Sequence, residues 1–246
     1  MKKMKSKMSN KKKIVFLGAS ITNGKVSKSF VKMLKDRLET KQYDFINRGV
    51  AGFEAYNVLN NLDKAVIAAP DFVIILVGTN DILSSLNPKL AKVSRKLKKI
   101  PHEPTLHFYS LHITSIIKRL KHETQANIAV ASLPVIGEDL TSVENKTVDE
   151  YNSELKKITE TEGITYLPVH ERQKKYLMDK IQGRGKDSTN STKMAFKALF
   201  LHYLLFMSFD NISKRNGFLL LTDGMHQNSV GAGIIADEVE NFIKAG

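Results

Sequence analysis

Short apolar runs alternate with helical patterns along this chain, and this alternation constrains the fold more than any other feature. The clearest run, at 72–77, reads FVIILV and is followed by Gly78. Continuous apolar runs of this length are typical of strands buried on both faces. The runs predicted as strands are 14–17, 43–47, 72–77, 128–133 and 164–169. The segments predicted as helices are 26–38, 55–68, 105–121, 148–160, 170–181 and 231–244.

Strand–helix repetition predicts an α/β fold, with a parallel sheet covered by helices on both faces. Right-handed crossovers would place the carboxyl ends of all the strands at one edge, where open α/β sheets form their sites. A length of 246 residues favours one α/β domain. We expect this domain to span 13–246, with a basic, disordered tail at 1–12 and an apolar helical insertion at about 192–210.

The chain carries a net charge of +13, much of it in the first 13 residues and in a second basic cluster at 89–99. Basic segments can contact nucleic acid or an anionic membrane surface, although a solvated tail that aids solubility is the simpler interpretation. No aromatic residues interleave with the N-terminal lysines, so no base-stacking groove is indicated and we expect no nucleic-acid partner.

Nothing in the sequence indicates export or a membrane span. The apolar run after the basic tail ends at Gly18, which is too short for a signal peptide. No stretch reaches the roughly 18 apolar residues of a spanning helix. The chain has no cysteine, which excludes disulfides and thiol chemistry and fits a reducing compartment. We therefore expect a cytoplasmic protein without a transmembrane segment.

Residues that could supply catalytic side chains or backbone hydrogen-bond donors follow the predicted strands. Ser20 follows the first strand, Gly52 lies in the loop after the second and Asn80 follows the third. Asp223 and His226 stand just before the last helix. Loops at one edge of a sheet converge in space, so these loops can build a single site.

These residue types match the parts of a serine hydrolase. The Ser20 hydroxyl can act as nucleophile, His226 as its base and Asp223 as the partner of the second ring nitrogen. The backbone N–H groups of Gly52 and Ser20 and the side-chain amide of Asn80 can stabilise a tetrahedral oxyanion. Asn80 is preferred to its neighbour Asp81 because an oxyanion needs a donor and a carboxylate is an acceptor.

The sequence resembles the SGNH/GDSL hydrolases over residues 13 to about 245. The resemblance rests on four blocks in the family's order: GASIT at 18–22, Gly52 five residues after Asn47, GTND at 78–81 and DGMH at 223–226. Ala19 stands where the family's name pattern has an aspartate that is not a triad member. Tyr151 and Asn152 also resemble a recurring family feature with a structural role.

The resemblance implies a flavodoxin-like, three-layer α/β/α sandwich with about five parallel strands, which is the SGNH hydrolase fold. It implies Ser20 as nucleophile, His226 as base and Asp223 as orienter. It also implies an oxyanion hole formed by Ser20, Gly52 and Asn80.

Cofactors and metals are not expected. The other histidines lack the spacing of metal ligands, and no cysteine is present to join them. The glycines around Ser20 fit neither the dinucleotide fingerprint nor the P-loop. Simpler roles exist for the site residues as well, since Ser20 could cap a helix and Asn80 could serve only as a turn residue.

The apolar segment 194–209 has two interpretations. It can be a core or dimer-interface helix, which leaves a homodimer open, or a lid over an acyl pocket. Phe200, Leu204 and Leu205 are the candidates for lining that pocket or lid.

The sequence as a whole predicts a GDSL-like serine esterase or lipase that hydrolyses carboxylic esters through an acyl-enzyme on Ser20. The substrate would be a small-molecule, lipid or carbohydrate ester. Two alternatives stay open: an acyltransferase with the same triad, and a non-catalytic binding module for an anionic polymer.

Overall fold

A five-stranded parallel sheet forms the centre of the protein in the computed structural model, which describes residues 11–38, 41–181 and 207–246. The strand order is β2-β1-β3-β4-β5, the flavodoxin-like order, and all four neighbouring pairs are parallel. The strands are β1 (Lys12–Gly18), β2 (Tyr43–Gly49), β3 (Phe72–Leu76), β4 (Asn127–Ala131) and β5 (Thr165–Leu167). The predicted fold class is therefore confirmed.

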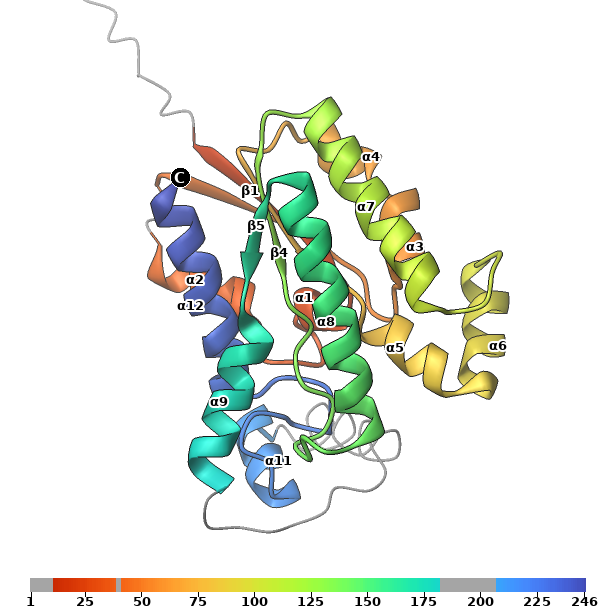
Figure 1. Cartoon of the computed structure of the whole chain (residues 1–246). Helices are drawn as coiled ribbons and strands as arrows, with labels where there is room; N and C mark the ends of the chain where they lie inside the picture. Colours follow the sequence, from red (N-terminus) through yellow and green to blue (C-terminus); the bar gives the residue numbers. More distant parts are fainter. Residues whose placement is uncertain (1–10, 39–40, 182–206) are drawn as a thin grey trace, which may run out of the picture.

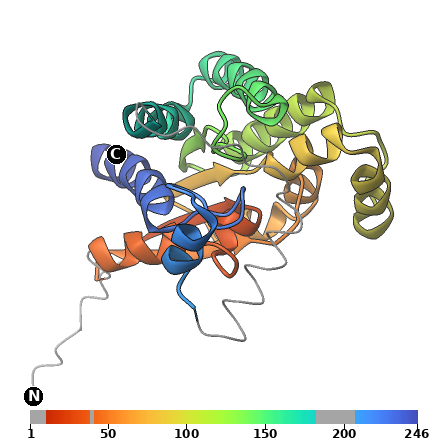
Figure 2. The same cartoon turned by 90° about the horizontal axis from the view of Figure 1, so that it is seen from below.

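Helices lie on both sides of the sheet and complete a three-layer sandwich (Figures 1 and 2). Those before β4 are α1 (Ser20–Asn23), α2 (Phe30–Arg37), α3 (Ala55–Asn60), α4 (Asp63–Val66), α5 (Thr79–Leu86), α6 (Pro88–Lys98) and α7 (Leu106–Glu123). Those after β4 are α8 (Val143–Glu162), α9 (Val169–Ile181), α11 (Phe209–Asn216) and α12 (Ser229–Ala245).

The core is divided by the sheet into two apolar layers. Successive side chains of a strand point to opposite faces, so Val15 and Val73 pack in the layer of α3, α7 and α8. Ile14 and Ile74, one residue away, pack in the layer of α2 and α12. All five residues of β3 are buried, as expected for a central strand with helices on both faces.

Several predicted helix boundaries were wrong because capping residues were not recognised. The predicted helix 26–38 begins only at Phe30, where the Ser29 side chain caps α2. The predicted helix 148–160 begins earlier, at Val143, because Ser142 caps α8. The predicted helix 55–68 is two short helices, with α3 ending at its C-cap Asn61. Of the described helices, four were not predicted: α1, α5, α6 and α11.

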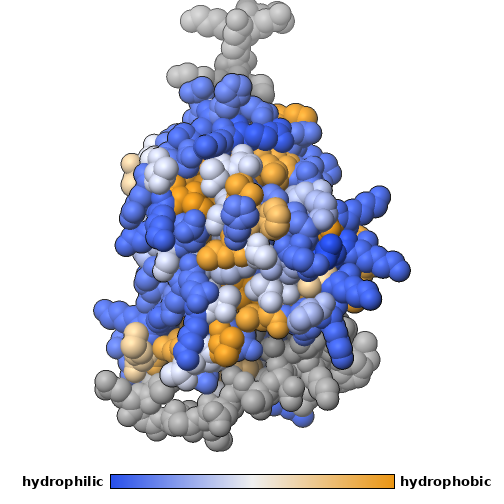
Figure 3. All heavy atoms as spheres, turned by 45° about the vertical axis from the view of Figure 1, so that its right-hand side comes forward, coloured by the Kyte–Doolittle hydropathy of each residue, from blue (hydrophilic) through white to orange (hydrophobic). Residues whose placement is uncertain are grey.

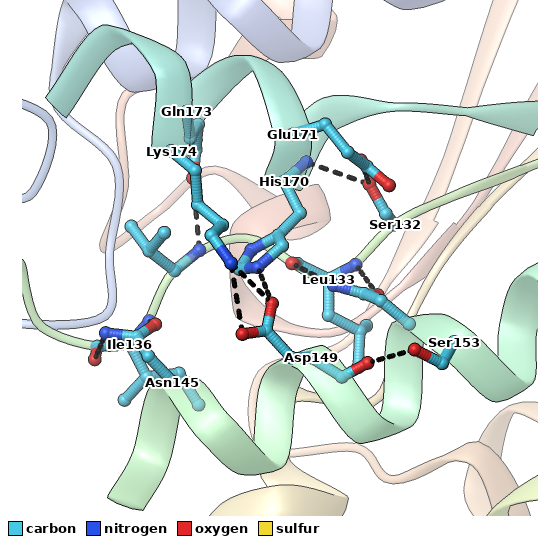
Figure 4. Close-up of polar contacts among 12 residues, drawn as sticks. Ser132, Leu133, Ile136, Asn145, Asp149, Ser153, His170, Glu171, Gln173 and Lys174 are labelled. Atoms are coloured by element: carbon cyan, nitrogen blue, oxygen red, sulfur yellow. Dashed lines mark hydrogen bonds and ion pairs between the residues drawn. The ribbon is translucent and has the colours of Figure 1, made fainter. Parts of the chain in front are cut away.

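A polar seam joins α8 and α9 to the end of β4. The Asn152 side chain bonds both the backbone N–H and the carbonyl of Leu133, at 2.7 and 3.0 Å, which confirms its structural role. The Asp149 carboxylate lies 2.8 Å from His170 Nε2 and 2.9 Å from Lys174 Nζ, so it links α8 to two residues of α9 (Figure 4). The seam fixes the loop that leaves β4 at the carboxyl edge of the sheet.

The predicted domain limits remain a prediction, although Lys12, placed in the tail, already belongs to β1. Residues 1–10 and most of the predicted insertion lie outside the described residues, and the end of the insertion runs into α11 with Ser208 as its N-cap. No described helix combines the length and apolar character needed to cross a bilayer. The cytoplasmic location also remains a prediction.

Candidate active site

Ser20 lies at the carboxyl edge of the sheet, at the sharp turn from β1 into α1. The turn depends on Gly18, where a Cβ atom would stand 2.1 Å from Thr22 Oγ1 and 2.3 Å from the Leu76 carbonyl oxygen. Only glycine permits so close an approach of α1 to β3. Ser20 itself is only half-buried.

A chain of two hydrogen bonds joins Ser20 to His226 and Asp223. His226 Nε2 lies 2.9 Å from Ser20 Oγ, and His226 Nδ1 lies 2.7 Å from Asp223 Oδ2. An ionised carboxylate can only accept a hydrogen bond, so this geometry suits the imidazole tautomer that has its proton on Nδ1 and leaves Nε2 to accept from the serine hydroxyl. Residues predicted from opposite ends of the sequence therefore meet in the arrangement that activates a serine.

The loop 222–226 fixes the shape of this pair. Asp223 is 1% exposed, and its Oδ1 accepts from the backbone N–H groups of Met225 and His226, at 3.1 and 2.9 Å. The loop is closed by the Thr222 N–H, which donates to the His226 carbonyl at 2.7 Å. One carboxylate oxygen thus holds the backbone, and the other is left for the imidazole.

Contacts from other parts of the chain hold the residues on either side of this loop. The Ser27 hydroxyl accepts from the Gln227 N–H at 2.9 Å, and Gln173 Nε2 donates to the Gln227 side chain at 2.7 Å.

The Glu138 carboxylate accepts from three successive backbone N–H groups, those of Leu219, Leu220 and Leu221. Burial raises the pKa of Glu138, and these three hydrogen bonds oppose the shift. Glu138 was missed because a lone glutamate in a loop carries no signal in the sequence.

The two other candidate donors, Gly52 and Asn80, belong to segments that contact each other. Gly52 follows β2 with a φ of +78°, in the left-handed region that favours glycine. Asn80, at the start of α5, donates through Nδ2 to the Phe53 carbonyl at 2.8 Å. A primary amide has two N–H donors, so one remains for a ligand. The loop is also tied to β1, because the Val50 N–H donates to the Gly18 carbonyl at 3.1 Å.

A largely buried cluster of charged side chains contacts the loop that contains Gly52. Lys98, at the end of α6, donates through Nζ to the Gly52 carbonyl and lies 3.7 Å from Glu54 Oε1. Glu54 is 3% exposed and accepts from Ser84 Oγ at 2.9 Å. Burial and the nearby Glu54 charge raise the pKa of Asp81 well above its ordinary value, while its bond from the Ala55 N–H and the Lys98 charge oppose the shift. The contacts of Lys98 and Glu54 with the Gly52 loop were not predicted from the sequence.

Phe200, Leu204 and Leu205, the acyl-pocket or lid candidates, lie outside the described residues and remain a prediction. Within the described ranges, no three histidine, cysteine or acidic side chains converge in a way that could hold a metal ion.

Comparisons with solved structures find the same fold at low sequence identity. An acetyl xylan esterase, AlAXEase, is 18% identical with a TM-score of 0.66, covering 93% of this chain and 98% of its own. Axe2, an acetylxylan esterase from Geobacillus stearothermophilus, is 16% identical with a TM-score of 0.66 and 96% coverage of both chains. LAE5, an α/β hydrolase enzyme from the metagenome of Lake Arreo, Spain, is 15% identical with a TM-score of 0.67, covering 96% of this chain and 98% of its own.

The sequence itself finds no match among curated proteins. It does match the family model described as the GDSL-like Lipase/Acylhydrolase family, over residues 16–193. This match spans more than half of the chain and includes Ser20, Gly52 and Asn80; Asp223 and His226 lie beyond it and are placed beside Ser20 by the structure alone. The chain belongs to the GDSL-like Lipase/Acylhydrolase family and is a carboxylic ester hydrolase.

Proposed function

We propose that this hydrolase forms an acyl-enzyme on Ser20, with His226 as the general base and Asp223 as the residue that orients it. The observation that carries the proposal is the continuous hydrogen-bond chain from Ser20 Oγ through the imidazole to the buried Asp223 carboxylate. In a neutral imidazole with its Nδ1 proton directed to a carboxylate, Nε2 is ready to take the serine proton.

The reaction follows from these positions. Ser20 Oγ attacks the ester carbonyl carbon while its proton moves to His226 Nε2. The tetrahedral intermediate then breaks the bond to the alcohol, which leaves with the proton from Nε2. A water molecule, deprotonated by the same nitrogen, attacks the acyl-enzyme and releases the acid and free Ser20. Throughout, Asp223 stabilises the imidazolium and keeps the ring in place.

The oxyanion of the intermediate would bind to the backbone N–H groups of Ser20 and Gly52 and to the side-chain amide of Asn80. These groups lie just after the carboxyl ends of β1, β2 and β3, beside the point where the strand order reverses. The Asn80–Phe53 hydrogen bond supports this assignment, because it joins the two donor segments and fixes the amide plane.

A small-molecule or carbohydrate ester is the substrate class that we propose. The names of two similar structures, both acetyl xylan esterases, support short acyl groups on a carbohydrate. The test is to measure acetate release from acetylated xylo-oligosaccharides and p-nitrophenol release from p-nitrophenyl esters of increasing chain length. A burst of p-nitrophenol equal to the enzyme concentration would support the acyl-enzyme. Failure to hydrolyse any ester of the panel would contradict the proposal.

Replacing Asn80 with alanine is expected to lower kcat about 100- to 1000-fold, because one preorganised oxyanion donor is lost. The measurement is steady-state hydrolysis of p-nitrophenyl acetate. Asn60→Ala, on the exposed end of α3, is the matched control and is expected to keep wild-type kinetics. An Asn80→Ala enzyme with unchanged kcat would remove this residue from the oxyanion hole.

Replacing Lys98 with methionine is expected to lower kcat about tenfold or more while KM changes little. The Gly52 carbonyl would lose the cation that holds the 52–53 peptide, so the neighbouring 51–52 peptide, which carries the Gly52 N–H, would be held less firmly. Lys98 would act only through Gly52, as a positioning residue. Lys98→Arg, which keeps a donor, should recover part of the loss, whereas Lys96→Met on the exposed side of α6 should leave the kinetics unchanged. An equal loss in the Lys98→Arg and Lys98→Met enzymes, or none in either, would contradict this role.

A further inference from the structure

Helix α6 presents a row of aliphatic side chains to solvent. Leu90, Val93 and Leu97 are 42%, 54% and 75% exposed, whereas Ala91 and Ser94 on the adjoining side of the helix are buried against the protein. Residues three and four apart share a face of a helix, so the three exposed residues form one continuous strip, the α6 apolar stripe. Single exposed apolar residues are ordinary, but three on one face of a surface helix indicate a contact surface.

A row of lysines runs beside this stripe. Lys89, Lys92 and Lys96 are exposed at the same helical spacing and form the α6 lysine row. The helix contains no acidic residue, and its two other cations point elsewhere, Arg95 to Glu103 and Lys98 to Glu54 and Gly52. In the part of the chain that the structure describes, the three lysines of the row have no ion-pair partner.

The helix stands on the rim of the candidate active site. It follows α5 directly and projects from the side of the molecule near the carboxyl edge of the sheet (Figure 1). Figure 3 turns this side forward and shows hydrophobic patches among hydrophilic ones. The Lys98–Gly52 contact anchors the inner face of α6 to the candidate oxyanion loop, while the stripe and the lysine row face outward.

We propose that α6 docks this enzyme on the surface of a membrane that contains anionic lipids. An amphipathic helix with aliphatic residues on one side and lysines beside them lies in the bilayer interface, with the aliphatic groups among the acyl chains and the ammonium groups among the phosphates. Docking would place the active-site edge beside the membrane. The inference concerns where the enzyme sits and does not depend on which residues carry the ester chemistry.

Other occupants of this face fit less well. A single-stranded nucleic acid stacks its bases on aromatic rings, and the exposed α6 face has none. A second copy packed symmetrically through the same stripe would bring two lysine rows together, and like charges at close range repel. A bilayer with negatively charged headgroups satisfies the aliphatic and the cationic rows at once.

The absence of tryptophan from the sequence provides a direct probe. In full-length protein, Leu97→Trp places a single indole on the stripe, and Ile67→Trp places one on a residue that is 82% exposed outside α6. With vesicles of phosphatidylcholine and phosphatidylglycerol, the emission of the Leu97→Trp protein should shift to the blue and be quenched by brominated lipids. The Ile67→Trp protein should show neither effect. Emission that stays unchanged for both proteins would overturn the proposal.

Vesicle sedimentation distinguishes the contributions that the α6 lysine row, the α6 apolar stripe and the N-terminal tail make to membrane binding. Changing Lys89, Lys92 and Lys96 together to glutamine should weaken binding to anionic vesicles on the order of 100-fold. Changing Leu90 and Leu97 to glutamine should weaken it at least about tenfold. The charge-matched control changes the exposed lysines Lys35, Lys146 and Lys175 and should bind more tightly than the variant of the lysine row.

Hydrolysis of a soluble ester should stay unchanged in all of these proteins, so a failed ester assay in the wild type would bear on the proposed function and not on docking. Three results would overturn the docking proposal. The first is wild-type binding by both α6 variants. This includes the case in which binding is abolished only by changing Lys2, Lys3, Lys5 and Lys7 to glutamine. The second is a loss caused by the lysine changes but not by the leucine changes. The third is a dimer in solution that the α6 changes dissociate.

Discussion

Ser20→Ala is expected to lower kcat for p-nitrophenyl acetate about 10⁶-fold, to the level that binding and the oxyanion donors alone can sustain. The substitution removes the hydroxyl 2.9 Å from His226 Nε2 and leaves the imidazole with no nucleophile to deprotonate. A water molecule cannot fully replace it, because the serine is held in position by the turn from β1 into α1. The measurement is steady-state turnover of purified protein.

Folding of the Ser20→Ala protein should be unchanged, because Ser20 is only half-buried and its side chain caps no helix. Circular dichroism and thermal unfolding check this point. Ser153→Ala is the matched control, since Ser153 is exposed on α8 and its hydroxyl bonds only the Asp149 carbonyl among the described residues. Wild-type turnover by a folded Ser20→Ala protein would refute the proposed nucleophile.

Asp223→Asn is expected to lower kcat on the order of 10⁴-fold with little change in KM. In the wild-type protein, the carboxylate oxygen Oδ2 accepts a hydrogen bond from His226 Nδ1 at 2.7 Å. An amide NH₂ in its place would favour the tautomer with the proton on Nε2, which cannot accept a proton from Ser20.

Asparagine separates this electronic role from a structural one. Its remaining oxygen can still accept from the backbone N–H groups of Met225 and His226, so the loop should keep its shape. Asp223→Ala would lose both functions and should also lower the unfolding temperature. Asp139→Asn, in a loop where the carboxylate bonds only Thr141 among the described residues, should behave as wild type. Activity within tenfold of wild type in Asp223→Asn would contradict the assigned role.

The sheet and the candidate triad could be predicted because their signals are local. A buried strand such as β3 must be apolar at every position, and that pattern is visible without any tertiary information. Ser20, Asp223 and His226 could be found because chemistry demands particular residue types, and a parallel sheet brings its strand ends to one edge. Asn228 caps α12, so the Asp223 carboxylate is not needed for that role.

The remaining features depend on contacts that no local pattern encodes. Lys98 meets Gly52 across 46 positions of sequence only because α5 and α6 fold back over the loop. Glu138 accepts from the N–H groups of residues about 80 positions away. The predicted basic segment at 89–99 proved to be a helix, and its signals were the Asn87 cap and Pro88 at the first turn, which the charge pattern obscured.

The most direct test of the central claim is covalent labelling with a fluorophosphonate, followed by intact-protein mass spectrometry and peptide mapping. The account predicts one adduct per chain on Ser20, loss of ester hydrolysis in proportion to labelling, no adduct in Ser20→Ala and much slower labelling in Asp223→Asn. A protein that hydrolyses esters while its adduct maps to another residue, or that labels equally well without the Ser20 hydroxyl, would contradict the account.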